Sequence, residues 1–142
     1  MKADELTPKP RHGYVGWELP EHERSRLLEI ITPSYPDVIA HHVTHKFGVK
    51  ETYPLPHQTH GELIGVADDG DRVQAVIVTV GGEIYNENNG IYHITWSLDK
   101  SKGAKAFMSN QVIAAGNWTR FDTKIPVQLV PAFFETATTP AA

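Results

Sequence analysis

Two short stretches of the sequence share one pattern: Ala-His-His-Val-Thr-His-Lys-Phe-Gly at residues 40–48 and Tyr-His-Ile-Thr-Trp-Ser-Leu at residues 92–98. Each holds a His-x-Thr triplet inside a run of β-branched and aromatic residues, which is typical of a β-strand. Side chains alternate across a strand, so the histidine and threonine of one triplet share a face. If the two strands lie side by side or meet across a cleft, both pairs can face one small anion. The pairs are His42 with Thr44 and His93 with Thr95.

Length and composition exclude several classes of protein. The 142 residues fit one domain with a sizeable core. A net charge of −4 gives no basic field for long duplex DNA, so a nucleotide partner should be small. The absence of cysteine excludes disulfides and thiolate metal sites. Because the N-terminus is charged and no stretch approaches transmembrane length, we expect a cytoplasmic protein without membrane contact.

The rest of the chain predicts an α+β fold with a mostly antiparallel sheet, one long helix and one short helix. We expect residues 1–11 to be a disordered N-terminal tail, 12–135 a single domain and 136–142 a disordered C-terminal tail. Hydrophobic patterns and turn residues between them predict further strands at 13–19, 62–66, 72–80 and 124–135, a helix at 21–31 that Pro20 opens, and a short helix at 111–115.

Two imidazoles on opposite sides of a phosphodiester can divide acid–base catalysis between them. The unperturbed pKa of histidine, about 6.5, lets one ring take a proton from the attacking water or hydroxyl while the other gives one to the departing oxygen. The two threonine hydroxyls can donate hydrogen bonds to the non-bridging oxygens and stabilise the transition state. This chemistry needs no metal and no cofactor.

Alternation along the strands adds four candidate substrate-binding residues. Lys46 falls on the face of the first pair and Ser97 on the face of the second. Tyr14 and Trp17 could stack on a nucleobase, but they point to opposite faces of one strand, so only one of them can line the cleft. The lysines at 100, 102 and 105 have two open interpretations, a solvated loop or a rim that contacts phosphate.

The two motifs resemble those of the two-histidine phosphoesterase superfamily, the LigT-like group that includes RNA 2′,3′-cyclic phosphodiesterases. The family pattern, His-hydrophobic-Thr/Ser-hydrophobic, is matched by residues 42–45, with His45 departing from it at the fourth position, and by residues 93–96. The strand and helix around Pro20 match the usual opening. The resemblance implies a bilobal fold with pseudo-twofold symmetry, a phosphate in the cleft between the lobes, catalytic roles for both histidines and phosphate-holding roles for both threonines.

We therefore predict a metal-independent phosphodiesterase that hydrolyses cyclic phosphate bonds, either at 2′,3′-cyclic RNA ends or in cyclic oligonucleotide signals. The expected partner is a nucleotide or short oligonucleotide, and a homo-oligomer stays possible. One alternative is a binding module that holds a nucleotide in the same cleft without cleaving it. Another is a structural protein whose motifs only fill a sheet. A metal site at His41, His42 and His45 is disfavoured, because alternation puts His42 on the other face.

Overall fold

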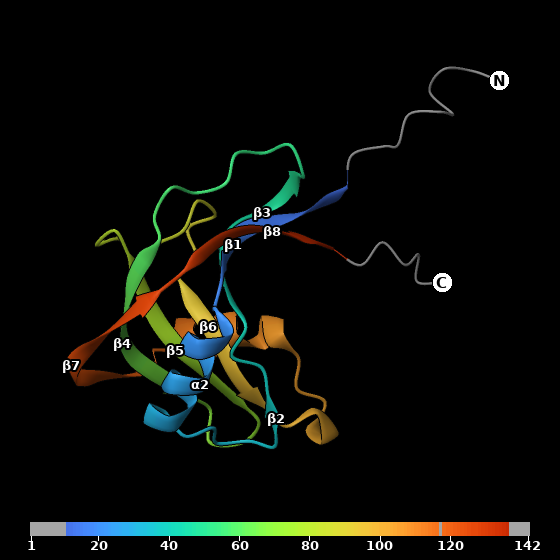
Figure 1. Ribbon diagram of the computed structural model, residues 1–142. Helices are drawn as coiled ribbons and strands as arrows, with labels where there is room; N and C mark the ends of the chain where they lie inside the picture. The colour runs from blue at the N-terminus through green and yellow to red at the C-terminus, as the bar shows by residue number, and fades with distance from the viewer. Residues whose placement is uncertain (1–10, 117, 137–142) are drawn as a thin grey trace.

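The computed structural model describes residues 11–116 and 118–136 and confirms the α+β class (Figure 1). Its strands form two antiparallel sheets, of three and five strands. Residues 1–10 and 137–142, where most of the two expected tails fall, lie outside the described residues. No helix within the described residues is long and apolar enough to cross a membrane.

The smaller sheet has the strand order β3-β1-β8. Its central strand β1 (His12–Glu18) pairs on one side with β3 (His42–Lys50), which carries the first His-x-Thr motif, and on the other with β8 (Val130–Glu135). The first motif therefore lies on an edge strand.

The larger sheet has the order β2-β6-β5-β4-β7, so the second motif lies on an internal strand. The strands β4 and β5 form the hairpin that Asp68-Asp69-Gly70-Asp71 predicts. The bounds are β2 (Asp37–Val38), β4 (His60–Asp68), β5 (Val73–Val80), β6 (His93–Leu98) and β7 (Trp118–Gln128).

The helices are short and lie outside the sheets. Helix α2 (Glu21–Ile30) begins after Pro20 as predicted, and its Leu27 is fully buried. After β6 the chain forms two 3-10 turns, η1 (Lys100–Lys102) and η2 (Ala106–Met108), and then α3 (Ser109–Ala114). The short helix predicted at 111–115 thus begins two residues earlier.

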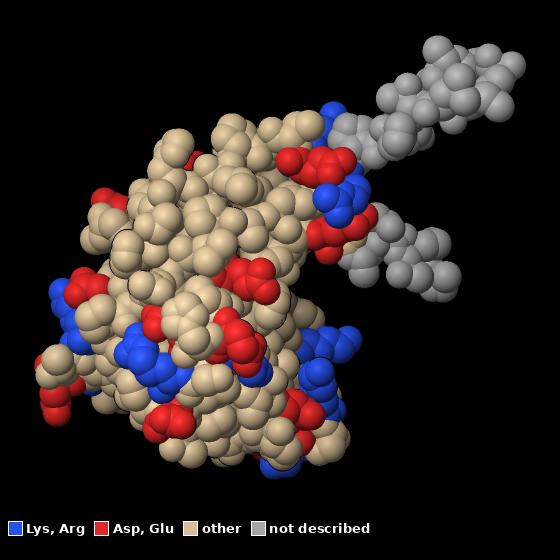
Figure 2. Space-filling model, in the orientation of Figure 1, with Lys and Arg blue, Asp and Glu red and all other residues tan. Residues whose placement is uncertain are grey.

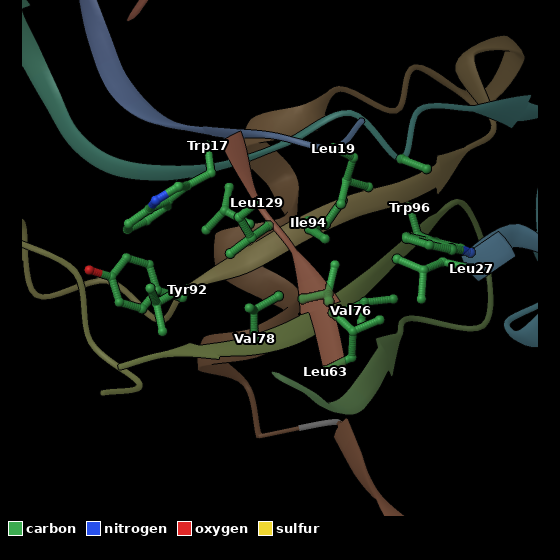
Figure 3. Close-up of a cluster of buried hydrophobic side chains, with 14 of the residues drawn as sticks. Trp17, Leu19, Leu27, Leu63, Val76, Val78, Tyr92, Ile94, Trp96 and Leu129 are labelled. Atoms are coloured by element: carbon green, nitrogen blue, oxygen red, sulfur yellow. The ribbon is translucent and has the colours of Figure 1, made fainter. Parts of the chain in front are cut away.

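The main core joins the two sheets and α2 (Figure 3). Trp17 of β1 and Trp96 of β6 are fully buried, and each indole N–H donates to a backbone carbonyl, of Gln58 at 2.7 Å and of Ile31 at 2.9 Å. Burying an aromatic side chain is favourable only if its polar atom keeps a partner, which both tryptophans do. The core therefore holds both motif strands in a fixed relation.

The C-terminal part differs from the prediction of one strand at 124–135. The structure has two strands there, β7 and β8, and the chain passes from the larger to the smaller sheet at Leu129. Both are edge strands, as the prolines Pro126 and Pro131 suggest, because proline cannot donate to a sheet on both sides. The two sheets are thus connected directly at this end of the chain (Figure 1).

Candidate functional site

Both His-x-Thr pairs line one cavity of about 420 Å³, although they belong to different sheets. The cavity lies between β3 on one side and β6 with the η2–α3 segment on the other. Within the described residues its lining contains no lysine, arginine, aspartate or glutamate. The lining residues are Tyr14, Ile39, His42, Thr44, Phe47, Asn86, Asn88, Gly90, His93, Thr95, Ala106, Phe107 and Asn110.

The first half of the site is held by aromatic packing. The His42 ring lies 4.9 Å from the ring of Phe134 and 5.3 Å from that of Tyr14, measured between centroids. Its Nδ1 atom is 3.1 Å from Nδ1 of His41, so one of these two nitrogens donates to the other. Burial is the main cause that lowers the pKa of His42 to about 4, and the charges of His41 and His93 add to it. At neutral pH His42 is therefore an uncharged base.

The second half is held by hydrogen bonds. Nδ1 of His93 donates to the carbonyl oxygen of Ile91 at 2.8 Å, which fixes the ring and leaves Nε2 free for a proton exchange. Burial lowers the pKa of His93, while the Ile91 carbonyl acts in the opposite direction because it stabilises the imidazolium. The Thr95 hydroxyl lies 2.9 Å from that of the buried Ser109.

The turn before β6 ties the two halves together. The Asn86 carboxamide oxygen accepts from the backbone N–H groups of Asn88 and Gly90, which closes the turn. Its neighbour Glu87 donates its backbone N–H to the carbonyl of His45 at 3.1 Å. The turn that leads into the second motif is thus anchored on the strand of the first.

The prediction that Lys46 and Ser97 face the cavity is wrong, for the same reason in both motifs. Gly16 and Val15 are consecutive on β1, but their partners on β3 are Thr44 and Lys46. His45 between them is therefore an extra residue. In the same way, Gln74 and Ala75 are consecutive on β5, but their partners on β6 are Ser97 and Thr95, so Trp96 is an extra residue. A β-bulge of this kind reverses the alternation beyond it.

The residues beyond each bulge therefore face away from the predicted side. Phe47, rather than Lys46, lies on the cavity face and is 57% exposed. Ser97 is fully buried, donates its hydroxyl to the Gln74 side chain at 2.6 Å and accepts from the backbone N–H of Tyr35.

Of the two aromatic candidates on β1, Tyr14 lines the cavity and Trp17 does not. The expectation that only one could do so agrees with this arrangement. Trp17 as a substrate-binding residue is wrong, because its ring is fully buried in the core and its N–H is used by Gln58. Tyr14 stacks between Phe47 and Phe134, with centroid distances of 5.7 and 5.1 Å.

Several lining residues were not predicted from the sequence. Asn88 accepts the Phe47 backbone N–H with its carboxamide oxygen, so its NH₂ group is available to a ligand. Asn110 uses its NH₂ group on the carbonyl of Phe107, so its oxygen is available. The Phe107 ring is 59% exposed at the cavity. Asparagine in a turn and at a helix start is so common that the sequence carries no signal for these roles.

His45, at the fourth position of the first motif, contacts core residues rather than the cavity. Nδ1 of His45 is 2.7 Å from the hydroxyl of Tyr92, and its ring packs edge-on against Trp17. Burial, with the charges of Glu87 and Glu83, raises the pKa of Tyr92 to about 12, so the phenol stays protonated and donates to His45. His45 thus lies on the core side of β3, away from the cavity that His42 lines.

No protein-family model matches the chain, and neither does any curated protein. Among solved structures, the crystal structure of a fungal RNA kinase is similar, with a TM-score of 0.60 and 14% sequence identity. The similar region covers 91% of this chain and 47% of that one, so the chain spans about half the length of the kinase. At this identity the likeness concerns the fold alone. It supports an α+β fold in which two antiparallel sheets meet around the cavity.

Proposed function

We propose that the protein is a phosphodiesterase that hydrolyses cyclic phosphate bonds of nucleotides or oligonucleotides with a pair of histidines. The observation that carries the proposal is that two His-x-Thr pairs, from strands of different sheets, line one cavity. The resemblance of both motifs to those of the two-histidine phosphoesterases supports it, and so does the fold shared with a fungal RNA kinase.

The two histidines have different environments, which suggests different roles. His42 has a pKa of about 4 and, among the described residues, no carbonyl partner for its ring, so it suits the base that takes a proton from water. His93 keeps a carbonyl acceptor on Nδ1, which favours its charged form, so it suits the acid. The negative charge of a bound phosphodiester raises the pKa of both rings and supplies the proton by uptake from solvent.

On a 2′,3′-cyclic phosphate the steps balance without another reactant. Water attacks the phosphorus as its proton passes to Nε2 or Nδ1 of His42, whichever is unprotonated. The bond from phosphorus to one ribose oxygen breaks, and that oxygen receives the proton from Nε2 of His93. The product is a phosphomonoester with a free ribose hydroxyl, and the proton on His42 returns to solvent. The hydroxyls of Thr44 and Thr95 donate to the non-bridging oxygens.

For a 3′–5′ link in a cyclic oligonucleotide, the ribose 2′-hydroxyl takes the place of water. It attacks the phosphorus, gives its proton to the base, and the 5′ oxygen leaves with the proton of the acid. The product then carries a 2′,3′-cyclic end. Both reactions use the same four side chains.

The test is hydrolysis of a 2′,3′-cyclic nucleoside monophosphate in EDTA, followed by separation of the products. We expect wild-type turnover and a loss of at least ~10²-fold in kcat/KM for His42→Ala and for His93→Ala. His60→Ala is the matched control, because His60 is exposed and does not line the cavity. Full activity of either motif variant would contradict the proposal.

A nucleotide-binding module is the second candidate function. The lowered pKa of both rings favours it, because a ring that is harder to protonate is a poorer source of the proton that a leaving group needs. Binding of the cyclic nucleotide by the wild type without turnover at any pH between 5 and 8 would support the module. Turnover in the same assay would exclude it.

A further inference from the structure

A second hollow opens directly beside the cavity that holds both motifs. It has a volume of about 480 Å³ and shares two lining residues, Ile39 and Ala106, with that cavity. Apart from two lysines its walls are apolar or glycine. The full lining is Ile39, Leu98, Lys100, Gly103, Ala104, Lys105 and Ala106.

The two hollows differ in charge. The motif cavity has no lysine or arginine among its described lining residues, so an anion there depends on neutral donors and on histidine protonation. The side hollow is lined by two lysines, Lys100 and Lys105, each of which carries a positive charge. Among the described residues that line the two hollows, a ligand with negative charge in both would therefore find permanent positive charge in the side hollow alone.

The three lysines of this segment are not equivalent. Lys102 pairs its ammonium group with the carboxylate of Asp71 at 3.1 Å and does not line the hollow. Lys100 and Lys105 make no ion pair within the described residues. The lower right of Figure 2, where β2 lies in Figure 1, shows lysine and arginine atoms beside acidic ones. The charge that remains for a ligand is thus on the two lysines that line the hollow.

The acidic groups near this segment are already engaged with backbone donors. Asp37 accepts the backbone N–H of Lys100 at 2.9 Å, and Asp99 accepts that of Ser101 at 3.2 Å. Neither carboxylate lines the hollow. These contacts hold the backbone of the lysine segment in place and leave the ammonium groups free.

We propose that the side hollow binds a second phosphate of the substrate, so that the enzyme prefers an oligonucleotide to a mononucleotide. This inference rests on the proposed function, and it selects a substrate class within it. The scissile phosphate lies between His42 and His93, and the neighbouring phosphate of the same strand lies between Lys100 and Lys105. The shared residues Ile39 and Ala106 border both hollows, so a ligand that reaches from one to the other runs past them.

The test compares two substrates, a 2′,3′-cyclic mononucleotide and a dinucleotide that carries the same cyclic end and one further phosphodiester. The variants are Lys100→Ala/Lys105→Ala and, as matched control, Lys102→Ala, which removes a charge from the same segment. An exposed ion pair contributes up to about fivefold, so we expect the double variant, which removes two, to lose up to about 25-fold in kcat/KM on the dinucleotide. We expect no change on the mononucleotide, and a control close to wild type on both.

Salt adds an independent readout. For single-stranded ligands the logarithm of the affinity falls by about 0.7 per phosphate contact for each unit in the logarithm of salt concentration. The double variant should therefore show a shallower salt dependence with the dinucleotide. An equal loss on both substrates, or no loss on either, would overturn the inference while leaving the proposed function intact.

Binding separates failure of the inference from failure of the proposed function. Both ligands are titrated into the His42→Ala/His93→Ala protein, with and without the two lysine substitutions. Tighter binding of the dinucleotide that depends on the lysines supports the side hollow even if the wild type proves inactive. If the wild type binds neither ligand, the inference and the proposed function are both wrong.

Discussion

The two halves of the site are built by different means, although their motifs are the same. On β6, an internal strand, His93 and Thr95 have hydrogen-bond partners in the backbone carbonyl of Ile91 and the hydroxyl of Ser109. On β3, an edge strand, His42 packs among aromatic rings, and the Thr44 hydroxyl has no hydrogen-bond partner within the described residues. The β6 half is thus fixed before a ligand arrives, whereas on β3 the Thr44 hydroxyl keeps its hydrogen-bonding capacity for the ligand and the hydrogen bond between the His42 and His41 rings links two side chains of the same edge strand region.

This difference suggests a division of labour between the halves. A fixed group costs little to order when the substrate binds, which suits the acid that must meet one leaving oxygen. An uncharged imidazole with a free donor beside it suits the half that activates the nucleophile. The predictions below test the comparison, in order of decreasing effect.

The largest effect concerns the dependence of the halves on each other. Each single substitution, His42→Ala or His93→Ala, should lower kcat/KM at least ~10²-fold. The kcat/KM of the double variant should lie within about tenfold of that of the less active single variant. Groups that act on one transition state are not additive. Rates of all three variants on a cyclic mononucleotide give the answer. Losses that multiply fully would mean that the histidines act in separate events.

Acid stability is the next largest effect. The pKa of His42 is lowered in the folded state to about 4, so from pH 6.5 downward the unfolded chain takes up a proton that the folded chain does not. The free energy of unfolding should fall by about 3 kcal/mol between pH 6.5 and pH 4 from this group, and burial of His93 acts in the same direction. Urea unfolding of wild type and His42→Gln at several pH values measures it.

In His42→Gln the acid-dependent loss should be clearly smaller than in the wild type. His60→Gln should follow the wild-type curve, because that side chain is exposed. Parallel curves for His42→Gln and the wild type would contradict the neutral state assigned to His42.

Anion affinity should depend on pH with a defined sign. A bound phosphate raises the pKa of the two rings from their lowered values, so binding takes up protons and affinity falls as the pH rises. The affinity should fall by at most about tenfold per pH unit for each proton taken up. Calorimetry with dimethyl phosphate, a phosphodiester that stays a monoanion between pH 5.5 and 7.5, in buffers of different ionisation enthalpy, measures the proton uptake. An affinity independent of pH would show that no imidazole becomes charged.

The smallest effect distinguishes the two threonines. Thr95→Val leaves the buried Ser109 hydroxyl without its partner, which should cost about 1 kcal/mol of stability. Thr44→Val should leave stability within about 0.5 kcal/mol of wild type, since that hydroxyl makes no hydrogen bond to the part of the chain that the structure describes. Both should lower activity. Equal stability of the two variants would show that the hydrogen bond on β6 does not fix its half of the site.

Much of the fold follows from local patterns. The alternation around His42 and His93 predicts both motif strands, and Pro20 predicts the start of α2 because proline suits a first helical turn. The last 12 predicted strand residues, 124–135, are divided by Leu129 between two sheets. A change of sheet depends on tertiary packing, and the apolar pattern of the segment continues through it.

The site was predictable to the extent that alternation holds. It holds within each triplet, and so the four motif residues share a cavity as the sequence indicates. It fails one residue beyond each threonine, where His45 and Trp96 are extra residues, and so Lys46 and Ser97 were placed on the wrong face. No residue type specific to a bulge occurs at either position. For the lysines at 100, 102 and 105 the sequence leaves two interpretations open, a solvated loop or a phosphate-contacting rim, and it does not show which lysine is paired, because Asp71 lies 31 residues from Lys102 in sequence.

The central claim is that both imidazoles act on one phosphorus atom. Ring-nitrogen NMR of ¹⁵N-histidine protein, titrated with a 2′- and with a 3′-nucleoside monophosphate, the two products that opening of the cyclic phosphate can give, tests it most directly. We predict that the His42 and His93 resonances shift together, toward the protonated form, with one common dissociation constant for each ligand, and that His60 does not respond. Shifts of only one of the two rings, or shifts with different dissociation constants, would contradict the account.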